Sequence, residues 1–201
     1  AGNGQQALAE QLFALRVPGG VARIPQDRHA LGVVGELPLW ENAVLERYAS
    51  PAFARFGWGR RERAMSHAKA LVEHFDVRGT EAAGLWTTTR SLSGGNMQKL
   101  ILARALAGDP GATAAPPLIV AHQPTWGLDI GAVAYVPQQL LDACAAGSAV
   151  LLISEDLDEI FALADRIAVM HAGRLGEARP AHEWTLASIG LAMAGEQAHA
   201  A

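Results

Sequence analysis

Two short, uninterrupted apolar runs constrain the fold of this chain more than any other feature. They are residues 118–121 and 149–153, and residues 131–146 between them have the length and composition of a helix. A strand that is apolar without alternation is buried on both faces, as in a parallel sheet covered by helices. A third apolar run, residues 166–170, follows the second after another helix-length stretch. We therefore expect an α/β fold with a mainly parallel sheet.

The first half of the chain is predicted to be mostly helical. Residues 5–15 have the apolar spacing of a helix, which ends before a Pro-Gly-Gly turn cluster. Residues 21–24 are predicted to form a short strand. Residues 38–77 are predicted to be mainly helix, with breaks near residues 50–51 and 57–59.

Composition limits the functions open to this chain. Its 201 residues suffice for one ordinary domain with a real core. The net charge of −4 and the lack of a basic stripe argue against a nucleic-acid partner. The one tight basic cluster, Arg60, Arg61 and Arg63, is expected on a solvated helix face.

Cys144 is the single cysteine, which excludes an intrachain disulfide and suits a reducing compartment. No apolar run approaches the ~18 residues that span a bilayer. The chain begins at Ala1 without a methionine, so we expect its true N-terminus to lie upstream.

A glycine turn at residues 92–96 (Leu-Ser-Gly-Gly-Asn), here called the signature segment, runs into a predicted helix over residues 94–107. The first N–H groups of a helix and the positive end of its dipole favour phosphate, and two glycines let a ligand approach closely. A serine cap with a glycine turn also starts many helices that bind nothing. The candidate phosphate-binding residues are Ser93, Gly94, Gly95 and Asn96.

Polar residues follow two of the predicted strands. His122 and Gln123 come after the first run, and Ser154 and Glu155 come after the second. Ligands of open α/β sheets bind at the carboxyl ends of strands, so both pairs are candidate site residues. The acidic residues from Glu155 to Glu159 are expected to complement a helix N-terminus capped by Ser154, and a metal site is the weaker alternative. The histidines lack zinc-ligand spacing.

Together these motifs resemble the ATP-binding-cassette (ABC) ATPases over nearly the whole chain. The signature segment resembles the LSGGQ-type motif of that family, and residues 123–129 resemble the Walker B exit and D-loop. Residues 153–160, 165–170 and 189–195 resemble the second, usually degenerate cassette of simple-sugar and nucleoside importers. The resemblance implies an ABC ATPase core of the P-loop NTPase type, with a mainly parallel sheet, a helical subdomain and missing N-terminal strands.

The resemblance also implies one partial nucleotide-binding domain over residues 1–201. The helical subdomain and signature loop would occupy about residues 36–95, the core residues 1–35 and 96–180, and a C-terminal tail residues 181–201. Missing strands leave a sheet edge exposed. We therefore expect the isolated chain to be marginally stable, or stable only when paired.

The opening residues take their roles from the same resemblance. Gly2, Asn3 and Gly4 fall within the P-loop, while Gln5 and Gln6 stand at the positions of its lysine and its Ser/Thr. In a P-loop those two residues hold phosphate oxygens and Mg²⁺. Uncharged glutamines weaken that stabilisation. Taken alone, Gly-Asn-Gly is more often an ordinary turn.

Further positions of the family's nucleotide site carry unexpected residues. The resemblance places His122 at the Mg²⁺-holding Asp, Gln123 at the catalytic Glu and Glu155 at the switch histidine, with Asp129 in the D-loop. Gln26 falls at the Q-loop, although a polar turn after a strand is an equally good interpretation. Glutamine orients water but cannot take its proton, and histidine is a poor ligand for a hard cation. We predict no hydrolysis at the chain's own P-loop and assign no catalytic residue and no metal site there.

The signature segment is the part that keeps the family pattern. In the family it contacts the γ-phosphate of an ATP held by a partner cassette, so ATP and Mg²⁺ are expected mainly at a composite site. That partner would belong to the same polypeptide or to a dimer. Transmembrane permease subunits and, indirectly, a solute-binding protein are the other implied partners. The implied location is peripheral, at the cytoplasmic face of the inner (plasma) membrane.

Three functions are compatible with the sequence. The first is the nucleotide-binding domain of an importer for simple sugars or nucleosides, which couples ATP binding and hydrolysis to transport. The second is a non-transport ABC ATPase of translation or DNA repair, which the lack of a basic groove disfavours. The third is a truncated, catalytically silent interaction module. The tryptophans are expected to pack in the protein rather than stack on bases, namely Trp40, Trp58, Trp86 and Trp184.

Overall fold

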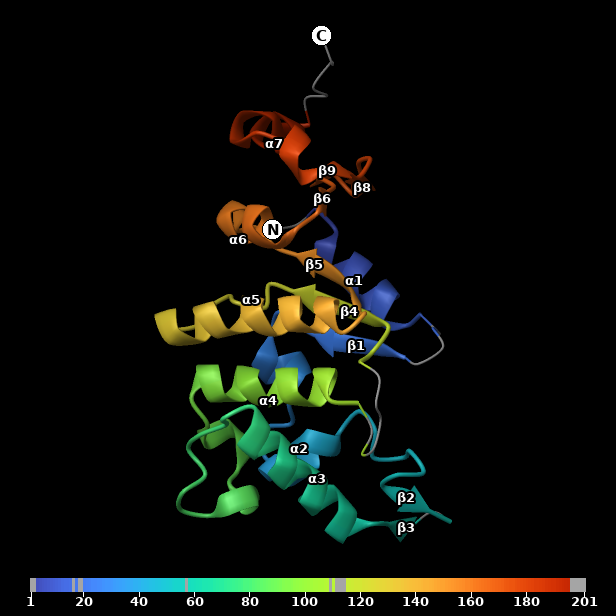
Figure 1. Ribbon diagram of the computed structural model, residues 1–201, viewed down its shortest axis with the longest axis vertical. Coiled ribbons are helices and arrows are strands. Elements are labelled where there is room, and N and C mark those ends of the chain that lie inside the picture. Colours follow the sequence, from blue (N-terminus) through green and yellow to red (C-terminus); the bar gives the residue numbers. More distant parts are fainter. Residues whose placement is uncertain are drawn as a thin grey trace.

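The computed structural model describes residues 3–195, apart from residues 16, 18, 19, 57, 109 and 111–114. Gly2 of the predicted P-loop, most of the Pro-Gly-Gly turn and the expected frayed tail at 197–201 lie outside the described residues. Figure 1 shows an elongated molecule with the sheet and its helices in the middle, a helical layer at one end and a small C-terminal unit at the other.

The central sheet is parallel and has the order β1-β4-β5. Its strands are β1 (Val21–Ile24), β4 (Leu118–His122) and β5 (Ala149–Ile153). Ile119, Val120 and Ala121 of the middle strand are fully buried, as continuous apolar runs require. The predicted parallel α/β fold and its strands are therefore confirmed.

Three helices pack around this sheet (Figure 1). They are α1 (Gln5–Phe13), α4 (Gly94–Leu106) and α5 (Ile130–Ala145). Helix α1 contacts β1 and β4, α4 contacts β1, and α5 contacts both β5 and α4. The main hydrophobic core lies where α4 meets the sheet, and Leu100, Ile101 and Leu102 are fully buried there. All three helices were predicted from the sequence, α1 from its apolar spacing, α4 from the segment after the glycine turn and α5 from its length between two strands.

The helical layer consists of α2 (Leu39–Val44) and α3 (Arg61–His74), which pack on each other and on α4. Short helical turns complete it, at Arg28–Gly32, Gly84–Trp86 and Thr89–Ser91. The prediction of mainly helix over residues 38–77 with breaks near residues 50–51 and 57–59 is right about the breaks, but the helix expected between them does not form. There an antiparallel ribbon forms between β2 (Ala54–Arg55) and β3 (Trp58–Gly59). Pro51 and the closely spaced glycines disfavour a continuous helix.

Buried polar side chains join the helical layer to α4. The Asn42 side chain, fully buried, accepts from the Val34 N–H (2.8 Å) and donates to the Val34 carbonyl and to Thr89 Oγ1 (both 2.9 Å). Arg104 of α4 donates to the Gly32 carbonyl (2.7 Å) and pairs with Glu46 at 3.1 Å. Burial lowers the pKa of Arg104, and the Glu46 carboxylate opposes that shift.

The C-terminal part forms a separate small unit. Its elements are α6 (Leu157–Leu163), β6 (Arg166–Ile167), β7 (Met170–His171), β8 (Arg174–Leu175), β9 (Arg179–Pro180), a helical turn at Ala181–Glu183 and α7 (Leu186–Ala194). The expectation that residues 166–170 form a third buried strand of the kind seen in β4 and β5 is wrong. These residues divide between two antiparallel pairs, β6-β9 and β7-β8. The tight turn at Ala172 and Gly173, both with positive φ, folds β8 back on β7.

The tryptophans do not behave alike. Trp184 is buried against Ile167 and Ile189, as predicted, and Trp40 packs edge-on against Trp86 with ring centroids 5.8 Å apart. Trp58, however, is 81% exposed, so the prediction that it packs in the protein is wrong. Its position on the two-residue strand β3 leaves nothing to cover it. Among the helices of the described part, none is long and apolar enough to cross a membrane.

Candidate functional site: the carboxyl edge of the sheet

The carboxyl ends of the three strands bring the predicted polar residues to one edge. His122 pairs in register with Ile153, so Gln123 and Ser154 emerge side by side. The Gln123 N–H donates to the Ile153 carbonyl at 2.7 Å. Ile24 of β1 pairs with Ala121, which puts Gln26 at the same edge. The sheet thus collects the segments that sequence reasoning singled out.

His122 and Gln123 are both buried at this edge. Burial lowers the pKa of His122, and the negative charge of Glu155 partly opposes that shift. The shift favours the neutral imidazole. Gln123 has a positive φ of 49° and is 9% exposed. Neither side chain offers a carboxylate oxygen for a hard cation or for a proton from water.

The N-terminal loop is held against the β7–β8 turn. The Asn3 carbonyl accepts from the Gly173 N–H, and its side-chain oxygen accepts from the Ala172 N–H, each at 3.1 Å. Gln5 folds back to accept from the Asn3 N–H at 3.1 Å. A hollow of about 360 Å³ lies beside the start of α1, lined by Gly4, Gln5, Gln6, Ala7 and Glu10.

The start of α1 is uncharged. Its N-terminal cap is Gly4, which has no side chain to bond the N–H groups of the first turn. Gln6 donates to Glu10 at 3.0 Å, so its amide is engaged within the helix. The dipole of α1 is available to an anion at this end, but no cationic side chain from the first turn adds to it.

The signature segment lies at the start of α4, close to the same edge. Ser93 is exposed and caps α4, where its oxygen accepts from the Asn96 N–H (3.4 Å) and the Asn96 side-chain amide (3.0 Å). Asn96 in turn accepts from the Arg78 N–H at 2.8 Å. Gly94 is partly exposed and Gly95 is buried. The predicted helix start and serine cap are confirmed.

Two side chains that sequence reasoning missed hold the signature helix to the loop after β4. Gln98 of α4 donates to the Pro124 carbonyl at 2.9 Å. Arg28, 9% exposed, donates to the carbonyls of Trp126 (2.8 Å) and Gly127 (2.9 Å). A methyl group on Gly94 would lie 3.6 Å from Arg28 Nε, so the guanidinium packs directly on the signature segment.

The acidic residues after β5 serve α6, but the predicted cap is wrong. Asp156, not Ser154, accepts from the N–H groups of Asp158 (2.9 Å) and Glu159 (3.2 Å). Helix α6 begins at Leu157, which leaves Ser154 too far upstream to reach its first turn. Ser154 instead accepts from the Asp156 N–H. Glu159 accepts from the Thr125 hydroxyl at 3.0 Å and so ties α6 to the loop after β4.

Two further predicted residues lie at the same edge. Asp129 is exposed at the end of the loop after β4, and its carbonyl accepts from the Val133 N–H in the first turns of α5. Gln26 is partly buried and precedes Asp27, which caps the turn at Arg28–Gly32. Both are positioned by helix starts, as loops at the carboxyl ends of strands usually are.

The residues at the chain's own nucleotide positions do not fit Mg²⁺. Within the described ranges no three His, Cys, Asp or Glu side chains gather as a metal site would require. Gln5 carries no charge, and His122 offers a ring nitrogen where a hard cation prefers oxygen. The signature segment fits a phosphate better, because an exposed serine and two glycines precede a helix of 13 residues.

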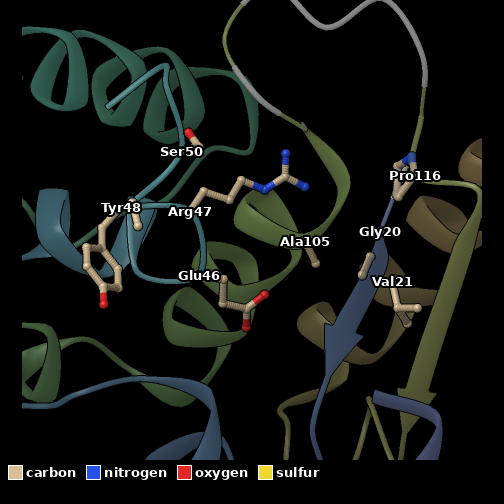
Figure 2. Close-up of a pocket in the computed structure, with 10 residues that line it drawn as sticks. Gly20, Val21, Glu46, Arg47, Tyr48, Ser50, Ala105 and Pro116 are labelled. Carbon is tan, nitrogen blue, oxygen red and sulfur yellow. The ribbon is translucent and has the colours of Figure 1, made fainter. Parts of the chain in front are cut away.

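A second hollow, of about 350 Å³, is unrelated to this edge. Figure 2 shows it between β1 and the segment after α2, with Glu46 and Arg47 facing Val21 and Pro116. Val21 begins β1 and Pro116 precedes β4, so the hollow lies at the amino ends of the strands. None of the predicted site residues lines it.

Comparisons with known proteins agree with this geometry. The fold is that of the ABC ATPase cassettes, and the sequence relatives of the chain are ATP-binding proteins of nucleoside and sugar import systems. It is 41% identical over 175 residues, 87% of this chain and 33% of the relative, to the nucleoside import ATP-binding protein NupA of Lactococcus lactis. It is 37% identical to the glucose import ATP-binding protein TsgD13 of Haloferax volcanii, over 97% of this chain and 38% of the relative. No family model matches the chain.

Solved structures support the fold. An inward-facing ABC transporter of the metal-chelate type matches with a TM-score of 0.71 and 16% identity, over 97% of this chain and 74% of that one. The dimeric ATP-binding cassette MJ0796, bound to ADP and phosphate, matches with a TM-score of 0.59 and 23% identity, over 80% of this chain and 62% of that one. The chain spans between 29% and 41% of the length of the curated import proteins that it matches.

Proposed function

We propose that this chain is one nucleotide-binding domain of an importer for nucleosides or simple sugars, and that it supplies the signature segment to ATP held by a partner cassette. The solute class is inferred from its relatives, which include import proteins for nucleosides, guanosine, glucose and ribose. ATP binding with Mg²⁺ is general in the family. In this proposal both are bound mainly on the partner's Walker motifs.

The position of the signature segment carries the proposal. Ser93 and Gly94 are accessible at the N-terminus of α4, beside the loop after β4 that Arg28 and Gln98 fix to that helix. An exposed helix start with two glycines binds phosphate from outside the protomer. The residues predicted for the chain's own nucleotide site support the same assignment. Gln5, His122 and Gln123 offer neither a cation for phosphate nor a carboxylate for Mg²⁺.

The remaining partners follow from this role. Such a domain works with permease subunits and, through them, with a solute-binding protein, and it is peripheral to the cytoplasmic face of the membrane. The residues at the carboxyl edge of its own sheet support a second site at which nucleotide is not hydrolysed. The transported solute would not contact this chain.

Substitution of Ser93 tests the proposal. In the complete importer, Ser93→Arg should lower ATP hydrolysis and solute uptake about 100-fold or more, because the long side chain blocks the anion position at the start of α4. Ser91→Arg is the matched control, since Ser91 is also exposed and its hydroxyl contacts the Thr88 carbonyl, outside the signature segment. Equal activity of the Ser93→Arg importer and the wild type would overturn the assignment.

A further inference from the structure

The β2–β3 ribbon and the start of α3, residues 54–63, expose a surface that differs from the rest of the chain. We call it the arginine ribbon. Phe56 is 88% exposed and Trp58 is 81% exposed, more than any other large apolar side chain in the described part. Large apolar side chains that stand free together mark an interaction site more often than isolated ones do.

The charge of the arginine ribbon is opposite to that of the whole chain. Its ten residues include Arg55, Arg60, Arg61 and Arg63 with one acidic residue, a net charge of +3 in a chain of net charge −4. Arg55 lies over the Phe56 ring at 5.2 Å, and Arg61 lies over the Trp86 ring at 4.6 Å. In the described part no carboxylate lies within ion-pair distance of Arg60 or Arg63.

The arginine ribbon is remote from the signature segment. It lies at the N-terminal end of α3, whereas Arg78, which follows the other end, donates to Asn96. A helix of 14 residues is about 21 Å long. Figure 1 shows β2 and β3 at the extremity of the helical layer. A partner cassette that covers the carboxyl edge would therefore leave this surface accessible.

We propose that the arginine ribbon docks on an anionic membrane surface. The rings of Phe56 and Trp58 would enter the headgroup layer, where amphipathic aromatic rings prefer to lie. The arginines would bind lipid phosphates, as basic clusters next to apolar side chains do at anionic leaflets. A stable protein interface takes about 20–30 residues a side, so a tip of ten residues suits a bilayer better than a protein partner.

This surface is independent of nucleotide chemistry. The proposal rests on the proposed function only in placing the protein beside a membrane. A vesicle assay measures no transport and no hydrolysis, so docking and the importer function can fail separately.

Cosedimentation with lipid vesicles tests the docking. The chain should bind vesicles of phosphatidylcholine with phosphatidylglycerol, bind pure phosphatidylcholine vesicles much more weakly, and dissociate at high salt. The double variant Arg60→Glu/Arg63→Glu should lose about tenfold or more in apparent affinity. Phe56→Ser/Trp58→Ser should weaken binding in the same assay while circular dichroism stays unchanged, because these side chains are exposed.

The β7–β8 hairpin provides a matched control, because it also presents an exposed arginine and an exposed apolar side chain. Arg174→Glu/Leu175→Ser should bind vesicles as the wild type does. In tryptophan fluorescence, the emission shift on adding anionic vesicles should vanish in Trp58→Phe and persist in Trp126→Phe. Absence of wild-type binding to anionic vesicles, or equal losses in the hairpin control, would overturn the proposal. Binding that required permease protein would assign the ribbon to a protein partner and overturn it too.

Discussion

The signature segment and the residues after β4 and β5 lie at the same edge of the sheet, yet they differ in how they are equipped. The signature helix is fixed by Arg28 and Gln98 to the loop after β4, and the buried Asn42 and Arg104 anchor the helical layer behind it. His122 and Gln123 are held just as firmly by β4 but carry no charge. Firm placement at this edge is therefore separate from the charge that phosphate or Mg²⁺ would need there.

The first test removes a buried side chain that supports the helical layer. Asn42→Ala should lower the free energy of unfolding by about 3 kcal/mol, because the Val34 N–H and several carbonyls lose their buried partner. Chemical denaturation followed by circular dichroism measures the change. Asn3→Ala, which removes a bond at an exposed turn, should cost far less. Similar losses in both variants would show that the buried Asn42 side chain supports the fold no more than a bond at an exposed turn does.

The second test weakens the hydrogen bonds between the loop after β4 and Arg28, the side chain that packs on the signature segment. Arg28→Lys keeps the charge but loses the two-pronged contact with the carbonyls of residues 126 and 127. In the complete importer, kcat for ATP should fall about tenfold, near 1.4 kcal/mol, with KM nearly unchanged.

Arg90→Lys is the control for that test, because Arg90 forms an exposed pair with Glu36 at 2.6 Å and touches no loop of the site. Its activity should match that of the wild type. In the Arg28→Lys importer, a rise in the KM for ATP with kcat unchanged would show that Arg28 acts on nucleotide affinity rather than on positioning.

The smallest effect is expected at the chain's own pocket. Gln123→Asn suits the positive φ of that position and removes nothing that hydrolysis on the partner needs. Steady-state ATP hydrolysis by the importer should change less than about twofold. A large loss would reveal a working catalytic glutamine and end the distinction between the two sites.

The parallel sheet could be predicted from sequence because β4 and β5 consist of apolar residues without alternation, a pattern that suits few other structures. The run at 166–170 is also mostly apolar, but it divides between β6, which pairs with β9, and β7, which pairs with β8. Whether such a run joins the sheet depends on contacts to residues 174–180, which a local pattern does not report.

In the candidate site, too, features set by neighbouring residues were predicted and features set by distant contacts were not. Ser93 and the start of α4 were predicted because capping is local chemistry. The role of Arg28 was not, because its partners are backbone carbonyls about a hundred positions away, and a carbonyl looks alike in every residue. The exposure of Trp58 was also missed, since a tryptophan in a sequence does not reveal whether a second layer covers it.

Helix α3 joins two distant parts of the molecule as a stiff rod. One end carries the arginine ribbon, and just beyond the other end Arg78 grips Asn96. Asn96 in turn donates to Ser93, so α3 and these two hydrogen bonds connect the arginine ribbon to the cap of α4.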